Sequence, residues 1–260
     1  MPASTRRSFL RAAAGSFAVI VPTQIPAQEK KEEPEVSPAE DLMREHGVLE
    51  RVLLVYEESA RLLTRGGEFD PKLLESAAGI VRDFVENYHE KLEQDYLFPR
   101  FEKANRLTDL VAVLRRQHEL GRQVTEQIRK LATAADIRTP AGRRRLAMFL
   151  QEFIRMYRPH AAREDTVLFP AFRQIVSANE YDSLGEEFEK KEHTLFGEEG
   201  FEKYVDLVAG LEKSLGIYDL SRFSPKPALA EAGAPKIGGR SGSAAPPGRT
   251  RGDIAPTSNA

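Results

Sequence analysis

The stretch HEKLEQDYLFPRF, residues 89–101, recurs as HAAREDTVLFPAF at residues 160–172. Both copies read H-x3-E-x3-L-F-P-x-F, so each places a histidine four residues before a glutamate. Residues i and i+4 lie on one face of a helix, and each copy therefore presents an imidazole and a carboxylate in the same direction. Two such pairs facing each other could hold two metal ions between them. The repeat makes a metal site the first hypothesis.

The repeat also includes two further histidines. His118 follows His46 by 118 − 46 = 72 residues, and His160 follows His89 by 160 − 89 = 71 residues. Each half thus carries one histidine on a first helix and an H-x3-E pair on a second helix. Two such hairpins predict an all-α bundle with approximate twofold symmetry, in which the inward polar residues of all four helices meet at the centre.

Capping residues and helix breakers indicate where the helices begin and end. Ser37 and Pro38 suit the N-cap and first position of a helix, and Gly66-Gly67 ends it. Pro99 and Pro170 are expected to end the second and fourth helices, because proline interrupts helical hydrogen bonding. The expected helices are 38–64, 71–99 after Asp70, one from Thr108, 140–170 after Thr139, one capped by Asn179, and a C-terminal helix within 198–215.

The composition excludes several classes of protein and of metal site. The chain has 260 residues and a net charge of −2, which does not indicate binding to nucleic acid. It contains no cysteine, so disulfides, thiolate zinc sites and iron–sulfur clusters are excluded. Any metal must therefore be held by nitrogen and oxygen ligands.

The N-terminus, STRRSFLR at residues 4–11, is similar to a twin-arginine export signal. The apolar stretch that follows, residues 12–21, is too short for an ordinary transmembrane helix. Cleavage near Ala27 is expected to leave no stable membrane span, and an uncleaved N-terminal anchor is the alternative. We therefore expect the twin-arginine machinery to export the protein to the periplasm or the cell exterior.

Four segments follow from this pattern. Residues 1–27 are the predicted signal peptide and residues 28–37 a charged linker. Residues 38–222 form the helical domain. Residues 223–260, rich in Pro, Gly, Ala and Ser, are predicted to be disordered.

Four histidines and two glutamates suit a dinuclear site for iron, zinc, manganese or copper. If Glu93 and Glu164 each bridge the two ions, His46 and His89 could complete one ion. His118 and His160 could then complete the other. Water, hydroxide or oxo would fill the remaining positions and leave room for an external ligand. The alternative is a bundle with buried His–Glu hydrogen bonds and no metal.

The order His46, His89 with Glu93, His118, and His160 with Glu164 resembles the hemerythrin-like, or HHE cation-binding, family over residues 40–215. The resemblance implies an antiparallel four-helix bundle with an oxo- or hydroxo-bridged di-iron centre. Its members carry or sense O2, respond to iron, or are associated with nitric oxide and peroxide stress.

The chain departs from the O2-carrying members of that family on the third helix. Those members have a second histidine one turn from the third-helix histidine, where this chain has Leu114 and Arg122. They also use an aspartate five residues after the fourth-helix histidine, and Asp165 stands at that offset beside Glu164. The repeat favours Glu164 as the ligand, because Glu164 matches Glu93, and Asp165 is the alternative. Two further candidate ligands are His193, as a fifth imidazole, and Glu90, next to His89.

The sequence thus predicts a di-iron protein that binds O2 or a related small ligand, as a carrier, store or sensor. Other divalent metals remain open. One alternative is a redox enzyme acting on peroxide or nitric oxide; it would need an unidentified redox partner, because no flavin, haem or nucleotide motif is visible. Another is an iron-sequestering protein or ferroxidase. The sequence does not decide whether the protein is an enzyme.

Overall fold

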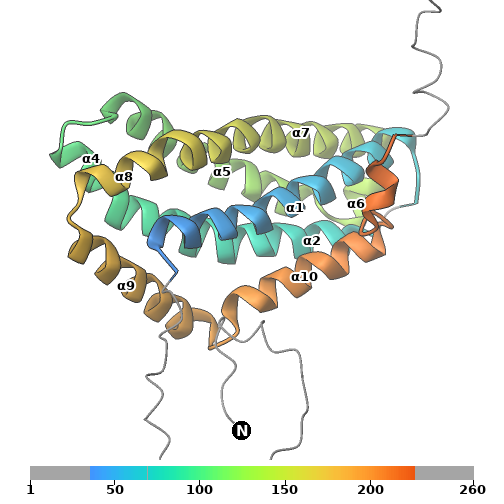
Figure 1. Cartoon of the computed structure of the whole chain (residues 1–260). Helices are drawn as coiled ribbons and strands as arrows, with labels where there is room; N and C mark the ends of the chain where they lie inside the picture. The colour runs from blue at the N-terminus through green and yellow to red at the C-terminus, as the bar shows by residue number, and fades with distance from the viewer. Residues whose placement is uncertain (1–35, 69, 226–260) are drawn as a thin grey trace, which may run out of the picture. The chain divides into compact units, whose positions relative to one another are not determined.

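The computed structural model describes residues 36–68 and 70–225. The predicted signal peptide, nearly all of the linker and the tail from residue 226 lie outside the described residues. The helices are α1 Pro38–Arg65, α2 Pro71–Ile80, α3 Glu90–Leu92, α4 Phe98–Lys103, α5 Thr108–Leu131, α6 Ala134–Ile137, α7 Pro140–Arg163, α8 Phe169–Ile175, α9 Ala178–Phe196 and α10 Gly200–Ser214 (Figure 1). The described residues contain no strand, which confirms the all-α prediction.

Three π-helical segments join some of these helices end to end, namely Val81–His89, Glu93–Leu97 and Glu164–Leu168. Residues 71–103 therefore form one continuous helical arm, and residues 140–175 form another. A short 3-10 turn, Leu220–Phe223, belongs to a second unit that begins at Leu220.

The four arms of the first unit form the predicted bundle. Helix α1 packs against α7 and against the arm of residues 71–103, and α5 packs against the same two neighbours (Figure 1). Helices α1 and α5 therefore occupy diagonal positions. The C-terminal helices lie outside the bundle: α9 contacts α1, and α10 contacts α1 and α2. None of the helices in the described part of the chain is long and apolar enough to cross a membrane.

Three of the expected helix starts are capped as the sequence predicts. The side chain of Ser37 accepts a hydrogen bond from the backbone N–H of Glu40 at 3.3 Å. Asp70 does the same at the start of α2, and Thr139 at the start of α7. Gly66 ends α1 at a φ of 73°, in the left-handed region that glycine adopts without strain. Local capping chemistry therefore sets both ends of α1.

Two expected caps are wrong. Thr108 is already the first residue of α5; the residue before it, Leu107, adopts a left-handed φ of 52° and has no side chain that could cap the helix. Helix α9 begins one residue before Asn179, because Ser177 accepts a hydrogen bond from the N–H of Glu180 at 3.2 Å. Ser177 therefore accepts a hydrogen bond from a backbone N–H of the first turn, which is the role that the sequence assigned to Asn179.

The prediction that Pro99 and Pro170 end their helices is also wrong. Each proline lies in the first turn of a new α-helical segment, α4 or α8, and the arms continue to Lys103 and Ile175. Each proline follows a π-helical segment that begins at the glutamate of the repeated motif. Because proline lacks an N–H, it fits the first turn of a segment better than its interior. In both copies of the motif, the π-helical segment is followed by a new α-helical segment whose first turn accommodates the proline.

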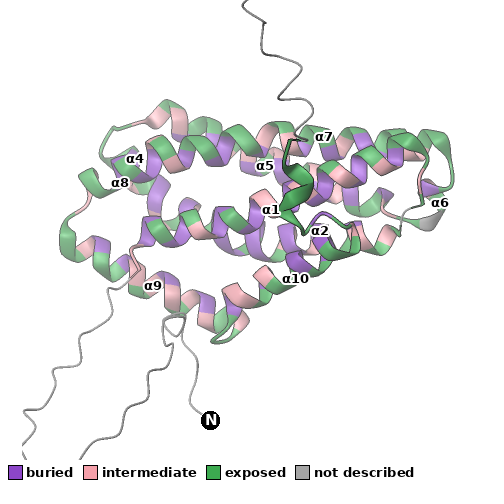
Figure 2. Cartoon of the chain, turned by 45° about the vertical axis from the view of Figure 1, so that its right-hand side comes forward, coloured by how far each residue is buried: buried purple, intermediate pink, exposed green. Residues whose placement is uncertain are grey.

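The faces of the helices that meet inside the bundle are buried, and the outer faces are exposed (Figure 2). Burial of large apolar side chains is the main source of stability for such a bundle. The largest fully buried side chains include Tyr56, Phe84, Phe98, Phe101, Phe153, Phe169 and Phe172. The same interior also contains buried histidines and glutamates, which form the site described next.

Candidate metal centre

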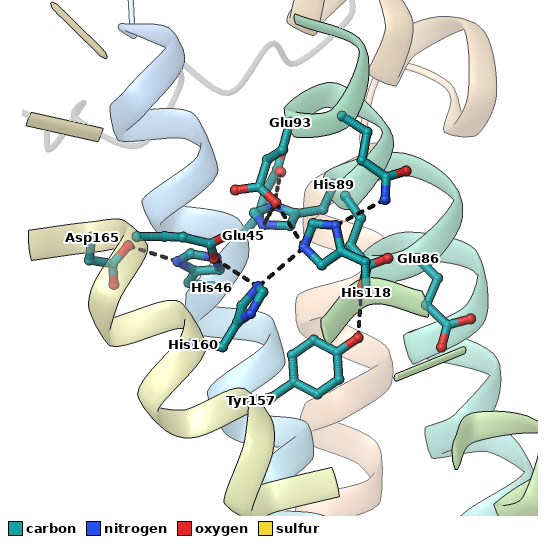
Figure 3. A network of polar contacts seen from close by, with 12 residues as sticks. Glu45, His46, Glu86, His89, Glu93, His118, Tyr157, His160 and Asp165 are labelled. Carbon is teal, nitrogen blue, oxygen red and sulfur yellow. Dashed lines mark hydrogen bonds and ion pairs between the residues drawn. The ribbon is translucent and has the colours of Figure 1, made fainter. Parts of the chain in front are cut away.

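Six buried polar side chains from all four arms converge at one level of the bundle (Figure 3). Helix α1 supplies His46, α5 supplies His118, and the two π-containing arms supply the H-x3-E pairs. Each of the six is at most 4% exposed. The residues brought together are His46, His89, Glu93, His118, His160 and Glu164.

Each glutamate lies between two histidines that come from different halves of the repeat. Oε2 of Glu164 is 3.4 Å from His46 Nε2 and 3.1 Å from His160 Nε2. Oε2 of Glu93 is 3.8 Å from His89 Nε2 and 3.4 Å from His118 Nε2. All four histidines therefore turn the Nε2 atom towards the two carboxylates.

The six residues form two overlapping groups whose ligand atoms lie within 4.8 Å of one another. Both groups contain Glu93 and Glu164. The first group adds His46 and His89, and the second adds His118 and His160. The structure thus brings together the same pairs of histidines that the sequence suggested, around two shared carboxylates.

The other ring nitrogen of each histidine, Nδ1, faces outward to a polar side chain. A metal-binding histidine commonly donates its second N–H to such a partner, which fixes the orientation of the ring. The contacts are His89 with Glu45 Oε2 at 2.8 Å, His46 with Asp165 Oδ1 at 2.7 Å, His160 with Gln117 Oε1 at 2.9 Å, and His118 with Gln94 Nε2 at 3.1 Å.

Several atoms at the centre lack hydrogen-bond partners among the described residues. These are both carboxylate oxygens of Glu93, both of Glu164, and Nε2 of His89. Buried polar atoms without partners are costly, and native structures usually satisfy them. A metal cation at the centre would bind these atoms directly, so the donor set fits a metal. Nitrogen and carboxylate oxygen together suit first-row transition metals.

Burial and neighbouring charges shift the pKa values of the cluster residues in different directions. Burial lowers the pKa of His46, but the neighbouring carboxylates of Asp165 and Glu164 together outweigh burial and raise it to about 9. Burial and the neighbouring His46 lower the pKa of His89 to about 3. Burial also opposes the charge on Glu164, yet His160 and His46 hold its pKa well below the usual range.

Glu93 shows the opposite shift to Glu164. Burial, followed by the charge of Glu164, raises the pKa of Glu93 well above its usual range. Two buried carboxylates of like charge cannot both ionise cheaply. A cation between them would favour the charged form of both, which is a further reason why this donor set suits a metal.

Three of the predicted residues lie outside the two groups. Asp165 is the outer partner of His46, so Glu164 rather than Asp165 occupies the centre. Glu90 is buried, accepts a hydrogen bond from Tyr157 Oη at 2.6 Å and pairs with Arg122 at 2.7 Å. His193 is half-buried on α9, and the structure does not bring it into either group.

The sequence reasoning did not identify the outer partners Glu45, Gln94 and Gln117. The repeat contained a signal for them. Glu45 and Gln117 each precede a first-helix histidine by one residue, and Gln94 and Asp165 each follow a motif glutamate by one residue. Repeat-related positions therefore perform the same task in both halves.

Aromatic rings cover two of the histidines. Phe98 stacks on His118 with centroids 5.5 Å apart, and Phe169 stacks on His46 at 5.6 Å. These phenylalanines occupy the same position in the two copies of the motif, and both are buried. The residue before each phenylalanine, Leu97 or Leu168, is also buried. Apolar side chains around a metal site control the access of solvent to it.

A helical bundle with a buried histidine–glutamate cluster at its centre defines a class of metal-binding proteins. The family model of the Hemerythrin HHE cation binding domain matches residues 37–172. These residues include all six residues of the cluster. This chain belongs to the hemerythrin HHE cation-binding family, and its cluster fits a metal-binding hemerythrin-like protein.

Relatives in mycobacteria are similar over most of their length. The uncharacterized proteins Mb2018 of Mycobacterium bovis and Rv1995 of Mycobacterium tuberculosis are each 46% identical to this chain over 221 residues. The similar region covers 82% of this chain and 87% of each relative. No solved structure matches the chain significantly.

Proposed function

We propose that the protein holds two iron ions at this centre and binds O2 or a related small ligand through them. The observation that carries the proposal is the sharing of Glu93 and Glu164 by two groups of four potential ligands. A carboxylate that lies between two histidine pairs can give one oxygen to each ion. The two glutamates would therefore hold both ions at a fixed separation.

Each ion would receive two imidazoles and two carboxylate oxygens from the protein. Iron accepts such mixed nitrogen and oxygen ligands, and four protein ligands leave positions open for an external ligand. Zinc and manganese accept the same donors. The experiment below therefore counts directly how many irons the chain binds. When bound, iron supplies the capacity to bind and reduce small oxidants.

The surrounding residues orient the ligands and limit access to them. Glu45 and Asp165 hold the Nδ1 atoms of His89 and His46, so their Nε2 atoms point to the centre. Phe98 stacks on His118 and Phe169 stacks on His46, and these apolar rings would limit the access of water to both histidines. Such an enclosed site favours small uncharged ligands over larger polar ones.

A redox activity on peroxide or nitric oxide is the second candidate. It is favoured by the residues that flank His118 on α5. Leu114 and Arg122 occupy the positions one turn from His118, and neither side chain contains an imidazole. Both groups thus carry equal donors, whereas the O2 carriers of the family have a second histidine on the third helix and differ in this respect.

We also propose that the protein is exported in the folded state by the twin-arginine route, with its metal already bound. The supporting observation is the paired Arg6-Arg7 followed by Phe9-Leu10. Substitution of both arginines by lysine should retain the full-length protein in the cytoplasm. Unchanged export of this variant would contradict the proposal.

Anaerobic loading with Fe(II) tests the main proposal. We expect two irons per chain and a visible spectrum that changes when O2 is admitted. An adduct that disappears when O2 is withdrawn supports a carrier or sensor, and irreversible oxidation supports the redox activity. Binding of fewer than two irons per chain would contradict the dinuclear centre.

A further inference from the structure

The two potential metal positions differ in the groups that stand behind their histidines. His46 and His89 both face carboxylates, Asp165 and Glu45, through Nδ1. His118 and His160 both face carboxamides, those of Gln94 and Gln117. We call the first pair the carboxylate-backed position and the second pair the amide-backed position.

This difference follows the repeat. Glu45 and Gln117 are equivalent positions, and so are Gln94 and Asp165. At each of the two pairs of equivalent positions, one half of the repeat has the acid and the other has the amide. Glu45 and Gln117 each contact a histidine of their own half, whereas Asp165 and Gln94 each contact a histidine of the other half. Both acids therefore serve one metal position, and both amides serve the other.

The carboxylate-backed position is therefore the more electron-rich of the two. An Nδ1–H that donates to a carboxylate makes the opposite Nε2 a stronger base and a better ligand than one that donates to a neutral amide. Asp41 and Glu192 add acidic groups beside Glu45, since carboxylate oxygens of the three residues lie within 4.8 Å. A divalent cation gains more Coulomb energy on this side.

The amide-backed position is contacted by a cation, Arg122, whose charge is paired with the buried carboxylate of Glu90 at 2.7 Å. Arg122 donates to Oε1 of Gln94 at 3.3 Å, which turns the Gln94 amide nitrogen towards His118 Nδ1. A donor at Nδ1 favours the imidazole form whose proton sits on Nε2, the atom that a metal needs free. Arg122 thus weakens His118 as a ligand through the orientation that it gives to Gln94.

We propose that the two metal positions are inequivalent: the carboxylate-backed position fills first and binds its ion more tightly than the amide-backed position. This inference rests on the proposed dinuclear centre. It assigns Glu45, Asp165, Gln94 and Gln117 as positioning residues that set the order of filling, although none of them lies among the six residues of the cluster.

A titration of the metal-free full chain with Co(II) tests the order, because bound Co(II) is followed by visible absorption and by calorimetry. We expect two steps whose affinities differ by about 10-fold or more. The matched pair His46→Ala and His118→Ala removes repeat-related ligands. His46→Ala should lose the tight step, and His118→Ala should lose the weak step. The reverse assignment would overturn the proposal.

Exchange of acid and amide at equivalent positions tests whether these residues cause the difference in metal affinity. Glu45→Gln should weaken the tight step by about 10-fold or more, and Gln117→Glu should strengthen the weak step. Glu57→Gln is the control, because Glu57 lies on the same helix with a side chain that is 61% exposed. If Glu45→Gln does not fold, Gln117→Glu still decides the question. Unchanged affinities in the folded exchange variants would overturn the proposal.

The stoichiometry separates this proposal from the one on which it rests. Two Co(II) ions that bind in two equal steps would overturn the inequivalence and leave the dinuclear centre intact. Binding of fewer than two Co(II) ions by the unmodified protein would overturn both.

Discussion

The two halves of the bundle, residues 38–103 and 108–175, are alike where they touch the cluster and different one layer behind it. Both place a histidine, an H-x3-E pair, a π turn and a stacked phenylalanine at equivalent positions. The comparison teaches that ligand geometry constrains the inner positions, whereas the residues behind them are free to set charge and volume.

The clearest difference in volume involves Tyr157 of the second half. A Cβ atom on Gly121 would lie 2.0 Å from Tyr157 Oη, so the absence of a side chain there makes room for the tyrosine. In the first half, the equivalent positions are Leu49 and Glu86. One half thus combines a large residue with glycine, and the other combines two residues of intermediate size.

Removal of a shared glutamate should have the largest effect and should break the symmetry of the cluster most severely. Glu93→Ala removes a ligand from both groups, and we expect it to lose nearly all bound metal. His89→Ala removes a ligand from one group and should leave about one ion per chain. Elemental analysis of the purified variants measures both. Retention of two ions by Glu93→Ala would show that this glutamate does not bridge.

The folding stability of the metal-free protein should depend on pH through Glu90, a buried carboxyl group that only the first half carries. Burial raises the pKa of Glu90 to about 8 from an ordinary 4.5, and Ala161 is its counterpart in the second half. A raised carboxyl pKa means that folding stability falls as pH rises from 4.5 to 8. The pKa of His46, raised from 6.5 to about 9, acts in the same direction, since its stabilisation is complete below pH 6.5 and is lost as pH rises through 9.

The lowered pKa of His89 acts in the opposite direction, but only between about 3 and 6.5. We therefore expect the metal-free protein to lose stability between pH 6.5 and 8, by at most roughly 1.4 kcal/mol per pH unit for each of Glu90 and His46. Urea denaturation at several pH values measures this slope. Glu90→Gln should reduce the slope, and a stability that rises over this range would contradict the expectation.

Gly121→Ala should destabilise the protein by about 1–3 kcal/mol, because the new methyl group would collide with Tyr157 in a packed interior. Gly79→Ala is the matched control. Gly79 is also helical, but no atom lies within 4 Å of the place that its new methyl group would occupy. The control should be neutral or stabilised by about 0.5–1 kcal/mol. Equal thermal stability of the two variants would mean that the tyrosine ring moves without cost.

His193→Ala should have the smallest effect. His193 lies on α9, outside the two halves of the repeat and outside both groups of potential ligands. We expect unchanged metal content and an unchanged spectrum after iron loading. A lost ion or a shifted absorption band would show that α9 contributes a ligand to the loaded protein.

The fold and the convergence of the six central residues follow from the sequence because both depend on periodicity. Helical spacing puts His89 and Glu93 on one face, and the offset of the repeat places His46 and His118 opposite each other. The contacts behind the histidines were not predicted. Glu45 becomes the partner of His89, and Gln117 the partner of His160, only because different arms pack together. Spacing along one helix does not specify that packing.

The prolines show a second limit of sequence reasoning. Pro99 and Pro170 are strong helix-breaking signals, yet the helical arms continue through them. A π turn depends on how a wider backbone turn fits against neighbouring helices, and local propensity carries no information about that fit. The wrong caps at Thr108 and Asn179 are smaller errors: α5 begins after Leu107 without a side-chain cap, and Ser177 caps α9 in place of Asn179.

The sharing of Glu164 by both groups also dictates when the cluster can be completed during biosynthesis. The ribosome adds about 5–20 residues per second, and the N-terminal parts of a chain emerge first. His46, His89 and Glu93 appear early, but neither group has its fourth member until residue 164 has been made. Until then the nascent chain offers neither of these two sets of four potential ligands in complete form. Selection of the ion falls to the finished bundle rather than to the growing polypeptide.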